Sequence, residues 1–396
     1  MQKGQCGGQP SSGQVKPGAT PSDCREENWV NANATVDNEQ LADTYRAFGC
    51  SANALDVSQL FAKYGEAGFL YEDKRRKLTP FFARIEENWD RALACGEQLM
   101  WFLTYDSPEG DVWASVGAWR STLLGWNSQH LVSIGGPTGS RAVMLAAAAT
   151  RGTERYSCED QFQQNWFRPS NRFANRVFGS IVPALGEGMA AVRQYMYVAV
   201  HLRSMPPEGD ADVKAATSEQ LDWRQFLIRN RGRVYVMCEE LDRSDVELAQ
   251  LDALYRKVGL RRYRRISVAC DHAGQVVGVA IAYRGPLGFN FSFLENRCDV
   301  VVDPTLDAGA ATGIASDLIR HVATNYSNFE PQFVPVVTDA GLAAQLVSIG
   351  ATPIREYSQS LWLGTDGYSG WFQHVSSFYD RMTRVERRRG LAATPH

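Results

Sequence analysis

The spacing of hydrophobic and polar residues divides the chain into two successive series of strands and helices. In the first series a helical pattern covers residues 38–98, and the helix that begins near residue 78 has Pro80 in its first turn, where proline is tolerated. Runs rich in β-branched and aromatic residues follow, two of them joined by a Pro/Gly turn at residues 107–110. The strands expected there are residues 99–105, 112–119 and 129–134. An alanine-rich helix over residues 140–149 ends the pattern.

The second series repeats this alternation after residue 230. Ser244 is the expected N-cap of a helix with an apolar face that includes Leu248 and Leu251. Another short helix over residues 340–349 is expected to end at Gly350. The strands expected in this series are residues 233–238, 265–270, 275–283, 298–302, 333–337 and 357–363.

The stretch from residue 296 to 322 is the most informative part of the chain. It predicts a buried strand that includes Val302, a stop at Pro304, a loop of small residues and an amphipathic helix. The first amides of such a helix lack partners within the helix and favour an anion such as a pyrophosphate.

A chain of 396 residues exceeds the size at which a single core keeps growing, so two domains are expected. Residues 111–120 and 275–284 resemble each other, which favours an internal duplication. The fold class predicted is α/β (α+β), with two domains that each have a mixed central sheet flanked by helices. The expected divisions are a disordered tail at 1–36, a domain at 37–204, a linker at 205–230 and a domain at 231–390.

Composition and charge exclude several classes of protein. The net charge of −3 gives no reason to expect nucleic-acid binding, and no segment is apolar enough to span a membrane. The N-terminus lacks a signal-peptide pattern, and the eight cysteines form no Cys-x-x-Cys pair, so we expect a reduced, cytoplasmic protein without a metal site. Oligomerisation stays open.

Three segments of the second series resemble the GNAT superfamily of N-acetyltransferases. The segment 302–304 (Val-Asp-Pro) is similar to the Val-x-Pro that ends the family's fourth strand, residues 310–315 are similar to its pyrophosphate loop, and residues 341–350 are similar to its acceptor-side helix. The resemblance implies two GNAT-like domains, the first of them degenerate, and acetyl-CoA or another acyl-CoA as cofactor. The cofactor-binding residues it implies are Val302, Ala310, Thr312, Gly313, Ile314 and Ala315.

The resemblance also implies an amine acceptor, either a small molecule or a peptide. Glu295 occupies the position of the family's general base, and Tyr357 is a second titratable candidate on the acceptor side. Glu295 as a solvated turn residue, and Tyr357 as a packing residue of a strand, are the structural alternatives. The tyrosine that protonates the leaving thiolate in the family is replaced by Val347 here and by Phe178 in the first series, and neither side chain donates a proton.

Two functions are therefore open. The first is an acyl-CoA-dependent N-acyltransferase in which the amine attacks the thioester directly. The alternative is a GNAT-like binding or scaffold protein that has lost the reaction.

Overall fold

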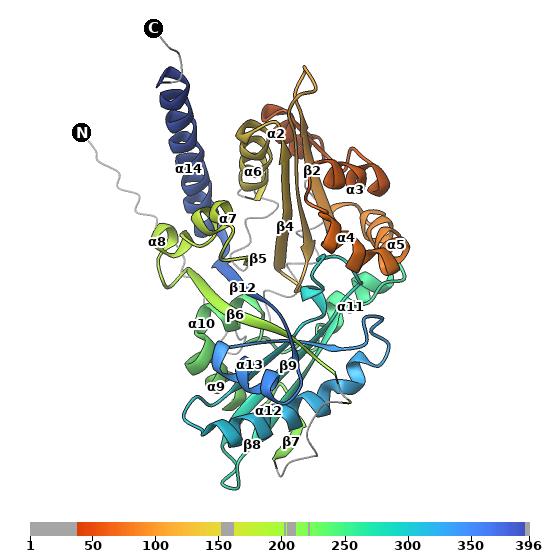
Figure 1. Cartoon of the computed structure of the whole chain (residues 1–396), viewed down its shortest axis with the longest axis vertical. Helices are drawn as coiled ribbons and strands as arrows, with labels where there is room; N and C mark the ends of the chain where they lie inside the picture. The colour runs from red at the N-terminus through yellow and green to blue at the C-terminus, as the bar shows by residue number, and fades with distance from the viewer. Residues whose placement is uncertain (1–37, 152–161, 202, 204–210, 221, 393–396) are drawn as a thin grey trace, which may run out of the picture.

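A computed structural model of the chain describes residues 38–151, 162–201, 203, 211–220 and 222–392, so the tail expected at 1–36 lies outside the described residues. The described chain is a mixed α/β structure built on one twelve-stranded sheet with helices on both faces, which confirms the predicted fold class (Figure 1). We call residues 38–200 the N-terminal half and residues 212–363 the C-terminal half.

The two halves contain the same order of strands, and the N-terminal half has in addition a helix before its first strand and a second short helix before its last strand. In the N-terminal half the elements are α2 (Asn38–Ala47), β1 (Cys50–Ala52), α3 (Val57–Glu66), α4 (Glu72–Leu78), α5 (Phe82–Leu93), β2 (Met100–Asp106), β3 (Trp113–Arg120), β4 (Gly125–Ile134), α6 (Pro137–Arg151), β5 (Phe162–Phe167), α7 (Arg172–Val177), α8 (Ile181–Leu185) and β6 (Ala190–Val200). In the C-terminal half they are β7 (Asp212–Ala215), α9 (Asp222–Arg231), α10 (Arg233–Cys238), α11 (Ala249–Arg256), β8 (Tyr263–Cys270), β9 (Val276–Arg284), β10 (Cys298–Val302), α12 (Ala308–Val322), β11 (Val334–Thr338), α13 (Ala340–Ser348) and β12 (Thr352–Leu363). The long helix α14 (Gly364–Ala392) follows.

The strand order shows that the halves exchange their last strands. Across the sheet the order is β1-β2-β3-β4-β5-β12-β6-β11-β10-β9-β8-β7. Strand β12 therefore pairs with β5 of the other half, and β6 pairs with β11 of the other half, both antiparallel. The two exchanged strands also pair with each other, from Thr352↔Ala199 to Trp362↔Ala190. From either edge of the sheet, the first five strands of one half come in chain order and are followed by the last strand of the other half. The sheet is therefore continuous between the two halves.

Three expectations from the sequence are wrong. Residues 233–238 form the helix α10 instead of a strand. In a short run that is apolar on most sides, the spacing of hydrophobic residues does not distinguish a helix from a strand. The first strand of the C-terminal half is β7, which lies inside the segment 205–230 expected as a linker, as does all of α9 except its last residue. Helix α11 begins at Ala249 rather than after Ser244, and the Asp245 carboxylate accepts hydrogen bonds from the first amides of this helix.

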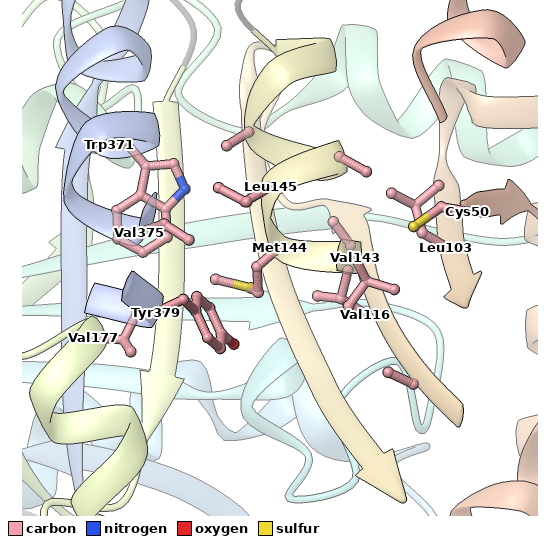
Figure 2. Packing of buried hydrophobic residues seen from close by; sticks show 14 of the residues in the cluster. Cys50, Leu103, Val116, Val143, Met144, Leu145, Val177, Trp371, Val375 and Tyr379 are labelled. Carbon is pink, nitrogen blue, oxygen red and sulfur yellow. The ribbon is translucent and has the colours of Figure 1, made fainter. Parts of the chain in front are cut away.

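Separate hydrophobic cores cover the two faces of the N-terminal half of the sheet. On one face α6 packs between the strands and α14, where Met144 and Leu145 meet Trp371 and Tyr379 (Figure 2). We call this the α6 face. On the opposite face α3 and α5 pack with residues of α11 and of the segment 285–293, and Trp89 and Phe291 belong to this core. We call this the α4 face, because α4 lies at its edge.

Neither a disulfide nor a cluster of three or more metal-ligating side chains occurs among the described residues. All cysteines within the described ranges are free thiols. None of the helices described is long and apolar enough to cross a membrane.

Candidate functional site

A pocket of about 760 Å³ opens where strands β4 and β5 diverge. The two strands are parallel neighbours, but their ladder extends only from Gly125↔Phe162 to Ser128↔Asn165. Beyond that point the backbone groups of β4 that face β5 have no strand partner among the described residues. Unpaired backbone groups in a cleft need other partners, so this gap is suited to an extended ligand that carries amides.

A β-bulge in β4 shapes the wall of this pocket. The register with β3 shifts between Ser115 and Gly117, so that two residues of β4, His130 and Leu131, lie opposite the single residue Val116. His130 has a left-handed backbone with φ of 56°. This conformation is uncommon for a residue with a side chain, and such residues concentrate at functional sites.

The imidazole of His130 is held among aromatic rings. Its centroid lies 4.4 Å from that of Phe291 and 5.5 Å from that of Trp89, and both rings are stacked on it. Within the described chain neither ring nitrogen has a hydrogen-bond partner. Burial and then the neighbouring charge of Lys74 hold the pKa of His130 well below its usual value, so the ring is neutral at physiological pH.

The pocket is lined from both faces of the sheet. From the α6 face come Gly136, Pro137, Ser140, Met144, Ala147 and Ala148 of α6 and the segment before it, Phe173, Ala174 and Phe178 around α7, and Trp362, Tyr368, Trp371 and Met382 of β12 and α14. From the α4 face come Gly68, Phe69, Tyr71, Lys74, His130 and the loop residues Asn290, Phe291 and Ser292. The gap between β4 and β5 therefore joins the two faces.

The segment before α6 leaves open space at the N-terminus of that helix. Gly135 must be glycine because a Cβ atom there would lie 2.1 Å from the carbonyl oxygen of Asp111. Gly136 has φ of 108°, and a Cβ atom on it would meet nothing within 4 Å. The first residue of α6, Pro137, has no N–H group, and the first turn contains no acidic residue, so the amides that follow Pro137 favour an anion.

Positive charge gathers at the α4 face of the pocket. Arg168, which follows β5, donates a hydrogen bond of 2.7 Å to the hydroxyl of Tyr71, and Arg355 of β12 donates one of 3.5 Å to the same hydroxyl. The Lys74 ammonium lies 3.6 Å from the ring centroid of Phe69. No aspartate or glutamate is among the described residues that line the pocket. The lining therefore favours an anionic ligand.

Tyr357 is the one predicted catalytic residue that lines the pocket. Its hydroxyl donates a hydrogen bond of 2.6 Å to Oγ of Ser292, in the loop between β9 and β10. Burial raises the pKa of Tyr357 above its ordinary value, so the hydroxyl keeps its proton at neutral pH.

Glu295, the other predicted catalytic residue, is fully buried and is not among the residues that line the pocket. Its carboxylate accepts backbone hydrogen bonds from Gly288 at 2.7 Å and from Asn290 at 3.3 Å. Burial raises the pKa of Glu295 from its ordinary value of 4.5 to about 8, in spite of these bonds. The side chain holds the loop that contributes Asn290, Phe291 and Ser292 to the pocket.

The structure places the predicted cofactor-binding residues in and around α12, away from the pocket. This helix begins at Ala308 and is capped by Asp307, whose carboxylate accepts a hydrogen bond from the amide of Ala310. Thr312, Gly313, Ile314 and Ala315 therefore lie beyond the first turn, where each amide donates to a carbonyl of the preceding turn.

Two packing contacts agree with this placement. Val302 and Ala315 are buried in the core of the C-terminal half. The side chain of Ile314 lies so close to Gly278 of β9 that a Cβ atom there would come within 2.8 Å of it. This geometry does not fit a pyrophosphate loop at residues 310–315.

The position in the C-terminal half that corresponds to the pocket is closed by side chains. Strands β10 and β11 pair only at Cys298↔Val336 and Asp299↔Val337. The Thr338 hydroxyl donates a hydrogen bond of 2.8 Å to the carbonyl of Val300. Arg231 donates a longer one, of 3.4 Å, to the same carbonyl. The carbonyl that the diverging strand exposes is thereby satisfied within the protein.

A buried ionic cluster lies beside the pocket. The Arg297 guanidinium, which is 1% exposed, contacts the carboxylates of Glu239 at 2.5 Å and Asp299 at 2.9 Å. It also lies 4.0 Å from the ring centroid of Tyr283 and 5.2 Å from that of Trp166, which lines the pocket. The cluster thus connects the C-terminal half to the wall of the pocket.

No protein-family model matches this sequence, and no curated protein matches it significantly. Solved structures of similar fold include a putative acetyltransferase from Pyrococcus horikoshii, which is 8% identical with a TM-score of 0.39 over 80% of this chain and 90% of its own. N-myristoyltransferase from Saccharomyces cerevisiae, with bound myristoyl-CoA, is 10% identical with a TM-score of 0.35 over 70% of this chain and 69% of its own. A probable N-acyltransferase from Enterococcus faecalis is 11% identical with a TM-score of 0.31 over 81% and 74%. At such low scores these likenesses carry no inference about the function of this chain.

Some residues of the pocket in the N-terminal half belong to local patterns that can be recognised in the sequence. The Gly-rich segment 135–140 at the start of α6 has a composition typical of a plain connection or of a phosphate cradle, and His130 is an isolated histidine in a strand pattern. Lys74 belongs to a basic run at residues 74–77, and nothing in the sequence distinguishes it from the other members of that run. In the structure Arg76 and Lys77 of that run pair with Asp73, whereas Lys74 turns toward Phe69.

Proposed function

We propose that the protein is an acyl-CoA-dependent N-acyltransferase and that the acyl-CoA binds in the pocket of the N-terminal half. The observation that carries this proposal is the divergence of β4 and β5 around a pocket that reaches the N-terminus of α6. Both halves also consist of mixed strands flanked by helices, as the resemblance to GNAT proteins implies.

The parts of acyl-CoA match the parts of the pocket. The pyrophosphate is an anion, and we place it at the first turn of α6, beside the open space at Gly136. The pantetheine arm contains amides, which suit the unpaired backbone of β4 beyond Ser128. Met144, Phe178 and Trp371 provide an apolar wall for the arm and the acyl group.

In the proposed reaction the amine nitrogen forms a bond with the thioester carbonyl carbon, and the carbon–sulfur bond breaks. The ammonium group of the acceptor loses one proton to solvent before the attack. The nitrogen loses a second proton once the new bond has formed, and this proton replaces the one that the donor gives to the leaving thiolate. Tyr357 is our candidate proton donor, because its protonated hydroxyl lies in the pocket. We assign Glu295 a positioning role, through the backbone of Gly288 and Asn290.

We further propose that the two halves arose by duplication of a GNAT-like unit and that the C-terminal half has lost its cofactor site. The repeated order of strands and the symmetric sheet support this history. Asp307 at the N-cap of α12 places a negative charge where α6 has Gly136, and this disfavours a pyrophosphate.

Calorimetric titration of the whole chain with acetyl-CoA tests the proposal. Two variants show which half of the chain binds the cofactor. Ala147→Leu adds bulk inside the pocket and is expected to weaken binding at least tenfold. Gly313→Ala, in the helix expected from the sequence to hold the pyrophosphate, is expected to leave binding unchanged.

Lack of binding at millimolar acetyl-CoA would refute the proposal for this cofactor. If Gly313→Ala loses binding and Ala147→Leu does not, the cofactor binds at α12 instead of in the pocket. Binding without transfer to any amine would favour the alternative, a protein that binds acyl-CoA without catalysis.

A further inference from the structure

We propose that the acceptor amine carries an acidic group, a carboxylate or a phosphate, and that Lys74, Arg168 and Arg355 bind this group at the α4 face of the pocket. This inference rests on the proposed N-acyltransferase function and adds the chemical class of its substrate.

The two arginines are fixed by neighbouring strands and by one phenol. Ser358 of β12 pairs with Phe167 of β5, so Arg355 and Arg168 extend from the same end of adjacent antiparallel strands. Both guanidinium groups donate to the hydroxyl of Tyr71, and that of Arg168 lies 5.6 Å from the centre of the Tyr71 ring. A planar guanidinium that is already oriented loses little freedom when it binds a carboxylate or phosphate.

Lys74 extends the positive charge into the pocket. Its ammonium contacts the ring of Phe69 and lies 5.4 Å from the centre of Phe291, so it faces the pocket wall rather than solvent. The neighbouring Asp73 is engaged by Arg76 at 2.7 Å and by Lys77 at 3.1 Å.

Within the part of the chain that the structure describes, the three cations lack an anion that would balance them. Among the described residues no carboxylate lies within 4.0 Å of Lys74, Arg168 or Arg355, and all three side chains are partly buried. Burial, followed by repulsion from Arg355, lowers the pKa of Lys74 to about 7. Like charges that are partly buried repel one another, and a bound anion would offset this electrostatic repulsion.

The sites proposed for the acidic group of the acceptor and for the phosphates of CoA lie on opposite faces of the sheet. The amides proposed for the pyrophosphate are on the α6 face, where Met144 and Trp371 belong to one core. Phe69 and Phe291, which surround Lys74, belong to the core of the opposite face. A ligand bound through Lys74 therefore approaches the gap between β4 and β5 from the side opposite to the cofactor.

The test measures acyl transfer by the whole chain from acetyl-CoA to the twenty amino acids, to their carboxamides, and to phosphoethanolamine and ethanolamine. Free thiol release reports the rate. We expect at least tenfold higher kcat/KM for the acids over their uncharged partners, because a hydrogen bond to a charged group is worth roughly 1.5–3 kcal/mol.

Lys74→Met and Arg168→Met are each expected to raise KM for the acidic acceptor roughly 10- to 100-fold with a smaller change in kcat. The matched control is Lys77→Met, which removes the same charge from the same helix outside the pocket and is expected to change neither constant.

Calorimetry with CoA alone separates the possible failures. Binding of CoA that is unchanged in Lys74→Met and Arg168→Met supports the acceptor role, whereas a tenfold loss shows that the cluster binds a phosphate of CoA and overturns the proposal. Acceptors that react equally well as acids and as amides also overturn it, and leave the N-acyltransferase function standing. If wild-type protein binds no CoA and acylates nothing in the panel, the proposed function fails, and this proposal fails with it.

Discussion

Replacing Glu295 by Gln tests whether a buried, protonated carboxyl group holds the loop of the pocket. Glu295 is fully buried, and its pKa is raised to about 8 by burial. A protonated carboxyl group offers one carbonyl oxygen to the backbone, and the Gln side chain offers the same oxygen in nearly the same shape. The bond from the amide of Gly288 can therefore survive the substitution.

The size of the effect follows from the difference in pKa between the two states. An unfolded chain ionises Glu295 near its ordinary pKa of 4.5, whereas the folded chain keeps the proton up to about pH 8. Between these values the folded state binds one more proton than the unfolded state, so the free energy of unfolding falls by about 1.4 kcal/mol per pH unit. The stabilisation from this group is complete below the unfolded pKa and is lost as the pH rises through the folded pKa. Between about pH 5.5 and 8 the loss amounts to about 3 kcal/mol.

Urea unfolding of wild type and Glu295→Gln over this pH range, followed by tryptophan fluorescence, measures the difference directly. All other titrating groups are common to both proteins, so they cancel in the difference. Relative to wild type, the variant should gain about 3 kcal/mol between pH 5.5 and 8. The control Glu219→Gln, at an exposed position, should show no such gain. If the two stability curves stay parallel, Glu295 is ionised throughout and the reasoning is refuted.

Three further substitutions make independent predictions. Gly313→Ala should raise the free energy of unfolding by about 0.5–1 kcal/mol in urea titration, because the position is inside a helix with open space around it; a loss of stability would contradict that environment. Arg297→Ala should destabilise the chain by about 3–5 kcal/mol in the same assay, because it leaves Glu239 and Asp299 buried without their partner; an effect below about 1 kcal/mol would show that the pair is hydrated. Lys74→Met should be more stable than wild type at and below pH 7, and its advantage should shrink as the pH rises toward 10. The reason is that the unfolded chain keeps the lysine proton to a higher pH than the folded chain does; a constant difference across this range would mean that the ammonium is fully hydrated.

The sequence predicted most strands of the fold because their periodicity is local. Residues 99–105 and 112–119 were expected as a hairpin, and they form β2 and β3 with only small changes at their ends. The run at 233–238 failed because helix and strand patterns coincide in a short, fully buried segment. No local pattern indicated that β12 would lie between β5 and β6.

The candidate site was harder to predict because it depends on contacts between distant segments. Residues 310–315 have the composition of a pyrophosphate loop, but Asp307 starts the helix early and engages the amide of Ala310. The pocket itself combines residues from α4, β4, the segment 290–292 and α14. The positions of Arg168 and Arg355 beside Tyr71 follow only from the pairing of β5 with β12, which the sequence does not reveal.

The exchange of β6 and β12 has a consequence for synthesis on the ribosome. Strand β5 and its half are made early, yet their neighbour in the sheet begins only at Thr352. Until that strand and the start of α14 have left the ribosome, the emerging chain lacks Tyr357, Trp362 and Trp371, and the pocket of the N-terminal half has no complete wall. A messenger that ends before codon 352 would therefore encode every residue of β4 and α6 and still yield no binding site.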